Sequence, residues 1–271
     1  MSLTTIRRYG RLIAICIAHR TPVVRAAIVV TRAFTCVVTL AFTLAVTLIS
    51  GPVQSQTASR YQNTPATTDG IGKRYMGREI AAVMGWQGAG WLEREERERE
   101  ERTDLLLSAL DLKPGMIVAD IGAGTGYLSR RMALAVGGSG TVLAVDVQPQ
   151  MIRILTKLSQ QKGLSNIKPS LGVEDDVKLP AESIDLAIMV DVYHELAYPY
   201  EVLASIIRAL KPGGQLVFIE YRAEDPNVPI KTVHKMTEAQ VRREAQEHAL
   251  AWERTDARLP WQHMIVFRKK S

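Results

Sequence analysis

The sequence predicts an α/β domain, built on a mostly parallel sheet with helices on both faces. Short apolar runs alternate with segments of helical periodicity from Leu112 onward. This alternation is typical of strand–helix–strand units, whose right-handed crossovers produce a parallel sheet. The chain has 271 residues, of which 46% are hydrophobic, and it can therefore bury a sizeable core. We expect a doubly wound sheet of seven strands, closed by an antiparallel strand at its C-terminal end.

The expected strands are short apolar runs bounded by turn residues, and the expected helices fill the segments between them. The strands cover residues 116–121, 141–147, 167–171, 184–190, 215–221, 250–255 and 263–267, of which the last two form an antiparallel pair. The helices cover residues 127–135, 151–162, 200–210 and 237–248. Pro149 stands where the second helix starts, a position that suits proline.

The first 55 residues differ in composition from the rest of the chain. They hold six arginines and no acidic residue, and the stretch 33–50 carries no charge. A basic segment followed by an apolar one and then by small polar residues is the layout of a secretory signal, with a candidate cleavage site before Gln56. The apolar stretch is also just long enough to span a bilayer.

We therefore expect residues 1–55 to form a signal peptide or membrane anchor, a hydrophobic helix outside the folded domain. The protein would be exported or membrane-anchored, with membrane association through residues 33–50. Two alternatives stay open. Translation that starts downstream of this segment would leave the protein cytoplasmic, and the segment could instead form a hairpin buried in the fold.

Charge and cysteine content narrow the function classes of the remaining chain. The sequence pI is 9.4, but residues 56–271 hold 28 basic and 28 acidic side chains, so the basic excess belongs to the leader. This balance gives no electrostatic footprint for DNA or RNA, and we expect no nucleic-acid partner. Cys16 and Cys36 both lie in the leader. The folded part therefore has no cysteine nucleophile and no cysteine zinc site, and we expect no metal site there.

Residues 56–103 are expected to form a linker followed by an N-terminal helical lid, ahead of a main domain over residues 104–271. Residues 51–72 are rich in Ser, Thr, Gln, Pro and Gly, which favours a linker. Residues 93–104 read EREEREREERTD, with acid–arginine pairs four residues apart. This spacing predicts a solvent-exposed helix.

The chemistry is indicated by a glycine-rich run at the end of the first main strand. Residues 120–126 read DIGAGTG, and glycines in this place let the backbone turn sharply and let a ligand approach closely. The spacing is G-x-G-x-G rather than G-x-G-x-x-G, because residue 127 is tyrosine. Tyr127 would obstruct the close helix–strand packing that nicotinamide enzymes require. Asp120 would place a carboxylate next to the pyrophosphate of the nucleotide, an unfavourable position for that group. An NAD(P)-dependent oxidoreductase is therefore a disfavoured alternative.

The run resembles the first motif of the class I, Rossmann-like S-adenosylmethionine-dependent methyltransferases, and later motifs of that family follow in order. Asp146 closes the second strand, where the family places an acid that bonds both ribose hydroxyls. The acidic run 174–176 resembles the site of the adenine amino group, for which Asp175 and Asp176 are favoured. Residues 185–191 resemble the fourth motif. The resemblance, closest to small-molecule enzymes of the quinone-biosynthesis type, implies S-adenosyl-L-methionine as cofactor. It assigns cofactor contacts to Asp120, Gly122, Gly124, Gly126, Asp146, Val147, Asp175, Asp176 and Asp191.

Each of these motifs also has a plain structural interpretation. The glycines could serve only a tight turn, Asp146 and Asp191 could be helix caps, and residues 174–176 could be a solvated loop. The functional interpretation is preferred because the motifs all fall at strand C-termini, where an open α/β sheet binds its ligand.

Catalysis is assigned to Tyr193 and His194, just past the fourth strand. A histidine here could accept a proton from a hydroxyl or amine acceptor near neutral pH. In the alternative interpretation Tyr193 packs over the cofactor and His194 caps a helix. We expect an unidentified small-molecule acceptor. The rival function is a non-catalytic module of the same fold, exported or anchored.

Overall fold

A computed structural model describes residues 59–271. The leader predicted over residues 1–55 lies outside the described residues. Within residues 59–271, no helix combines the length and the apolar character needed to cross a bilayer.

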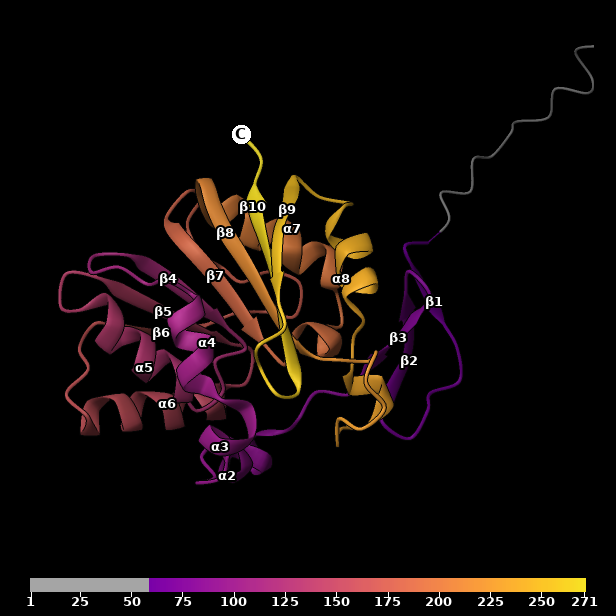
Figure 1. The fold of residues 1–271 in the computed structure, drawn as a ribbon, viewed down its shortest axis with the longest axis horizontal. Coiled ribbons are helices and arrows are strands. Elements are labelled where there is room, and N and C mark those ends of the chain that lie inside the picture. Colours follow the sequence, from indigo (N-terminus) through magenta and orange to yellow (C-terminus); the bar gives the residue numbers. More distant parts are fainter. Residues whose placement is uncertain (1–58) are drawn as a thin grey trace, which may run out of the picture. The chain divides into compact units, whose positions relative to one another are not determined.

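The centre of this region is a seven-stranded sheet with the spatial order β6-β5-β4-β7-β8-β10-β9 (Figure 1). Its first five strands are parallel, β10 is antiparallel to β8, and β9 is antiparallel to β10. The strands are β4 (Ile117–Ile121), β5 (Thr141–Asp146), β6 (Ile167–Leu171), β7 (Ile184–Val190), β8 (Leu210–Tyr221), β9 (Leu250–Asp256) and β10 (Gln262–Lys269). The predicted α/β fold with seven strands and an antiparallel C-terminal edge is confirmed.

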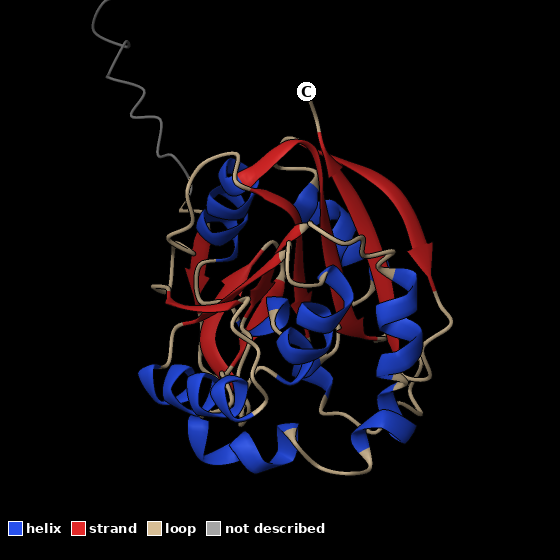
Figure 2. Cartoon of the chain, turned by 90° about the vertical axis from the view of Figure 1, so that its left-hand side faces the viewer, coloured by secondary structure: helices blue, strands red, loops and turns tan. Residues whose placement is uncertain are grey.

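Helices cover both faces of this sheet (Figure 2). The helices in question are α4 (Thr103–Ala109), α5 (Tyr127–Val136), α6 (Pro149–Gln161), α7 (Pro199–Ala209) and α8 (Glu238–Ala245). One core cluster joins α7 and α8 to Ala187 and Met189 of β7, and the other joins α4, α5 and α6 to Leu186 and Ile188. Successive residues of β7 thus point to opposite faces, and both faces are buried, as a parallel sheet requires.

Local signals explain where three helices begin. Proline stands in the first turn of α6 and of α7, where the missing N–H costs nothing. The hydroxyl of Thr237 caps α8 by accepting a hydrogen bond from the Gln240 amide at 3.0 Å.

Residues 61–81 differ from the predicted linker and helical lid. They form an antiparallel sheet of β1 (Tyr61–Asn63), β2 (Gly70–Tyr75) and β3 (Arg78–Ala81), visible beside α8 in Figure 1. Positive φ angles at Met76 and Gly77 make the tight turn between β2 and β3. The sheet is anchored by buried Tyr75 and Ile80 and by Arg78, which binds the buried Glu244 carboxylate at 2.8 and 3.1 Å. The helical part of the prediction survives only after residue 85, as η1 (Trp86–Gly88), α2 (Ala89–Leu92) and α3 (Arg97–Glu101).

The charged run 93–104 is not the exposed continuous helix that its spacing predicts. The helix is interrupted at Arg102, whose left-handed backbone, with a φ of 51°, separates α3 from α4. Arg97 and Glu101 are only 6% and 2% exposed, and they form an ion pair at 2.9 Å. The prediction was wrong because i,i+4 spacing fixes which side chains share a face, but not whether that face meets solvent.

Candidate functional site

A cavity of about 770 Å³ opens at the carboxyl ends of β4, β5 and β7. Gly122, Asp146 and Asp191, each just at or beyond the end of one of these strands, line it. Successive connections run outward in opposite directions from β4 and β7, so this is the switch point of the sheet. Open α/β sheets bind their ligands at such a point.

The glycine loop depends on residues without side chains. Gly122 and Gly124 line the cavity with φ angles of 71° and 55°. A Cβ at Gly122 would stand 2.5 Å from Val192 Cγ2, and one at Gly124 would stand 2.7 Å from Leu92 Cδ1. Any side chain would therefore push the loop away from its neighbours and alter the wall of the cavity.

Gly126 has a different role from the one that the motif predicts. It is the N-cap of α5, with a φ of 77°, and it does not line the cavity. A Cβ there would lie 2.8 Å from Leu155 Cγ, so its lack of a side chain lets α5 pack closely on α6.

Asp146 organises the wall of the cavity. Its carboxylate accepts hydrogen bonds from the Gly124 amide at 2.9 Å and from the Gln148 amide at 2.8 Å, and so joins the glycine loop to the start of α6. Burial raises the pKa of Asp146, and these backbone amides oppose the rise. Each carboxylate oxygen keeps a further lone pair, so a ligand with adjacent hydroxyls can bind both. Val147, 43% exposed, lines the cavity beside it.

Asp120 does not reach the ligand space, contrary to the prediction. It is buried beneath the loop, and its Oδ2 accepts a hydrogen bond of 2.5 Å from the Ser129 hydroxyl. Burial raises the pKa of Asp120 to about 6, although Ser129 partly offsets the rise. Its role is to tie the end of β4 to α5.

The acidic run 174–176 presents a different residue from those predicted. Glu174 and Asp175 are both exposed, but only Glu174 lines the cavity; Asp176 forms an ion pair with Arg208 at 3.1 Å. An isolated bridge between Val173 and Asp176 makes this segment a tight turn, which directs the middle of the run outward. Asp175 and Asp176, for which adenine contacts are predicted, therefore do not line this cavity.

Asp191 supplies a buried carboxylate with one oxygen that can still accept a hydrogen bond. Its φ is 55°, and its Oδ2 accepts a hydrogen bond from the Gln262 amide at 3.1 Å. Its Oδ1 has no hydrogen-bond partner among residues 59–271, although it is buried. Burial raises the pKa of Asp191 well above its usual range. A buried polar atom without a partner is costly, and a ligand N–H entering the cavity would satisfy it.

Tyr193 does not face the cavity and so does not fit the predicted catalytic role. It is fully buried, and its ring packs edge-on against Phe218 with 4.9 Å between centroids. It belongs to the core on the α7 face of the sheet.

His194 does line the cavity, within a network that sequence reasoning missed. Its Nδ1 lies 2.6 Å from Glu220 Oε2, and its Nε2 lies 3.2 Å from His234 Nδ1. Burial alone would lower the pKa of His194, but Glu220 and Glu195 together raise it to about 10. These two carboxylates favour the protonated ring, which opposes the role of proton acceptor; that role stays a prediction. Glu195 adjoins the predicted motif, whereas His234, on η3 (Thr232–His234), carries no sequence signal.

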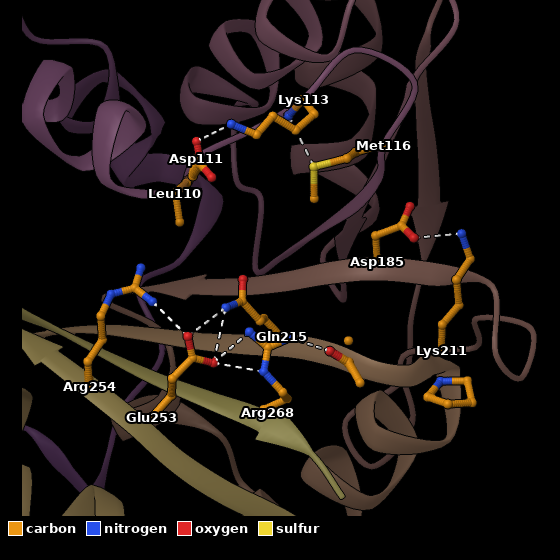
Figure 3. Close-up of a pocket in the computed structure, with 13 residues that line it drawn as sticks. Leu110, Asp111, Lys113, Met116, Asp185, Lys211, Gln215, Glu253, Arg254 and Arg268 are labelled. Atoms are coloured by element: carbon orange, nitrogen blue, oxygen red, sulfur yellow. Dashed lines mark hydrogen bonds and ion pairs between the residues drawn. The ribbon is translucent and has the colours of Figure 1, made fainter. Parts of the chain in front are cut away.

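A second cavity, of about 620 Å³, lies at the opposite end of the strands (Figure 3). Its charged side chains pair with one another. Lys211 bonds Asp185 at 2.7 Å, and Arg254 and Arg268 both bond Glu253. Each basic group here thus has an acidic neighbour, although Arg254 and Arg268 share Glu253, and this pairing weakens the cavity as a site for an anionic ligand.

Residues 112–263 match the family model described as a methyltransferase domain. The chain belongs to this methyltransferase family. The match covers every element that forms the first cavity except the segment before residue 112.

Curated relatives match only part of this methyltransferase. A ubiquinone/menaquinone biosynthesis C-methyltransferase of Hydrogenovibrio crunogenus is 29% identical over 111 residues, or 41% of this chain and 44% of that protein. A tRNA U34 carboxymethyltransferase of Desulfotalea psychrophila is 32% identical over 107 residues, or 40% of this chain and 32% of that protein. The aligned part spans less than half the length of both relatives.

Solved structures share the fold. A SAM-dependent methyltransferase from Aquifex aeolicus superposes with a TM-score of 0.66 at 23% identity, covering 69% of this chain and 100% of that one. A protein from Pyrococcus horikoshii superposes with a TM-score of 0.53 at 19% identity, covering 65% and 92%. At these identities the likeness concerns the fold of the methyltransferase alone.

Proposed function

We propose that this protein transfers a methyl group from S-adenosylmethionine to a small-molecule acceptor in the cavity at the carboxyl ends of β4, β5 and β7. The observation that carries the proposal is Asp146. Its buried carboxylate is fixed by two backbone amides at the wall of a cavity large enough for a nucleoside and an acceptor.

The residues of the cavity fit this cofactor. Asp146 offers two oxygens to a ribose diol. Gly122 and Gly124 have no side chains, so the cofactor can approach the backbone of the loop closely. The unpaired Oδ1 of Asp191 suits the ammonium group of the methionine part. Glu174 stands where an adenine amino group can donate to it.

The chain's part in methyl transfer is mainly positioning. When bound, S-adenosylmethionine supplies a methyl group that its sulfonium already activates. The protein therefore has to hold the acceptor in line and exclude water. The apolar side chains of Met84, Leu92 and Leu196, which line the same cavity, provide a dry wall for this purpose.

The small-molecule class of the acceptor rests on two supports. Relatives named for ubiquinone and menaquinone biosynthesis match the core, and residues 56–271 carry no net charge that would attract a nucleic acid. The tRNA-modifying relative makes RNA the second candidate acceptor. Transfer to RNA would show a steep fall with salt, whereas transfer to a neutral small molecule would not.

Calorimetric titration of the full chain with S-adenosylmethionine tests the proposal, with NADH as the control ligand. We expect saturable one-site binding of S-adenosylmethionine alone. Asp146→Ala removes hydrogen bonds to a charged acceptor, so its affinity should fall about 10- to 100-fold. Asp175→Ala, an acid of the neighbouring loop that points away from the cavity, is the matched control and should bind normally. Equal affinity in the two variants would refute the site.

We further propose that residues 1–55 export or anchor this methyltransferase. The proposal rests on the uncharged stretch 33–50 behind six arginines. A fusion of residues 1–55 to a reporter that is active only outside the cytoplasm should be active, and a fusion that lacks residues 33–50 should not. A silent reporter in both fusions would support the cytoplasmic alternative.

A further inference from the structure

Three side chains on the wall of the cavity place metal-ligand atoms close together. His194 and Glu195 come from η2 (Tyr193–Glu195), and His234 comes from η3. The two histidine nitrogens, Nε2 of His194 and Nδ1 of His234, lie 3.2 Å apart. Glu195 Oε1 lies 3.7 Å from the first and 3.3 Å from the second.

These three distances match those between the ligands of a tetrahedral ion. Zinc binds histidine nitrogen and carboxylate oxygen at about 2.1 Å, which puts tetrahedral ligand atoms about 3.4 Å apart. A circle through the three observed atoms has a radius of about 2.0 Å, so a point slightly out of their plane lies about 2.1 Å from each. An ion can therefore be accommodated with little movement of the side chains.

The surroundings of His194 have the form found around metal-binding histidines. The ring nitrogen remote from the cluster, Nδ1, bonds the fully buried Glu220 carboxylate at 2.6 Å. Glu220 is itself held by the Tyr193 amide at 2.8 Å. A carboxylate on the far nitrogen orients the ring, fixes its tautomer and strengthens the near nitrogen as a ligand.

We propose that His194, Glu195 and His234 bind one divalent transition-metal ion, with zinc as the reference ion. Two imidazoles and one carboxylate leave a fourth position free, and all three residues line the cavity. That position takes an oxygen ligand, such as a hydroxyl, phenol, enol or carboxylate. This last assignment rests on the proposed function, because the oxygen would belong to the methyl acceptor.

The lack of cysteine in residues 56–271 led to the prediction of no metal site. A set of two histidines and a glutamate needs no thiol, and its third member is brought in by the fold from a residue 40 positions away. The same atoms could also form a hydrogen-bonded chain with no ion, so the experiment must separate the two cases.

The test is zinc titration of the metal-stripped full chain by calorimetry. Cys16 and Cys36 are changed to serine, so that leader thiols do not compete for the ion. We expect one equivalent of zinc to bind. His234→Ala, whose side chain is partly exposed and tolerant of truncation, should weaken binding more than about 100-fold, because even an outer hydrogen-bond partner contributes about 10- to 100-fold. Glu220→Gln should weaken it by that smaller factor.

His248→Ala is the control, because this histidine stacks on Tyr200 away from the cluster. It should bind zinc as tightly as the parent. Absence of stoichiometric binding, or equal affinity in His234→Ala and His248→Ala, overturns the metal site. S-adenosylmethionine titrated into the same samples reports on the proposed function separately.

Cobalt provides the second readout. The Co²⁺ form should show the visible absorption of a four-coordinate nitrogen and oxygen site, lost in His234→Ala. Catechol, a small oxygen ligand, should change that spectrum because one position is open to the cavity. A spectrum that catechol leaves unchanged would contradict the open position.

Discussion

Replacing Gly122 with alanine should destabilise the protein and weaken cofactor binding together. The left-handed backbone at this residue, with a φ of 71°, costs alanine about 1–2 kcal/mol. The new Cβ would also stand 2.5 Å from Val192 Cγ2 and 2.7 Å from Cγ1, and relief of such overpacking costs about 1–3 kcal/mol. The free energy of unfolding should therefore fall by about 2–5 kcal/mol.

Urea denaturation of Gly122→Ala and Gly163→Ala measures the two parts separately. Gly163 has a φ of 67°, but a Cβ at this residue would meet no atom within 4 Å, so its alanine variant should show the backbone cost alone. The variant Gly122→Ala/Val192→Ala should recover the overpacking part through a favourable coupling energy. If Gly122→Ala and Gly163→Ala lose the same stability, contact with Val192 does not explain the glycine.

Three further predictions concern residues around the cavity. Glu101 is bonded by both Arg97 and Arg94, so Arg97→Ala removes one of its two partners and should cost about 1.5–3 kcal/mol in thermal or urea unfolding. Exposed Arg99→Ala should change the free energy of unfolding by less than about 0.5 kcal/mol. Burial raises the pKa of Asp120 from 3.8 to about 6, so the folded state binds the proton more tightly, and the free energy of unfolding should fall by about 2.4 kcal/mol as pH rises from 4 to 7. Asp120→Asn should lack this fall, and equal pH dependences of the variant and the parent would contradict the reasoning. Tyr193→Phe should bind S-adenosylmethionine like the parent, because Tyr193 does not line the cavity. A tenfold loss of affinity in this variant would show that Tyr193 contributes to the binding site.

Signals confined to one element were sufficient to predict most of the sheet and its helices. The strands over residues 167–171 and 184–190 have the predicted bounds, because apolar runs between turns are typical of buried parallel strands. Gly122, Gly124, Asp146 and Asp191 line the cavity, as expected of residues at strand C-termini, which meet at one edge of the sheet.

Features that depend on side-chain direction or on distant contacts were not predictable in the same way. The run 174–176 predicted that an acidic residue lines the cavity. The turn that begins at Val173 determines that this residue is Glu174. The sheet over residues 61–81 is stabilised by contact with distant Glu244, which no local pattern reveals. His234 meets His194 only because the chain beyond β8 returns over the cavity.

A crystal structure of the full chain grown with S-adenosylhomocysteine tests the central claim most directly. We expect the ligand in the cavity at the carboxyl ends of β4 and β5, with its ribose hydroxyls on Asp146 and its amino group on Asp191. Ligand in the opposite cavity beside Lys211 and Arg254, or ligand that leaves Asp146 untouched, would contradict the account.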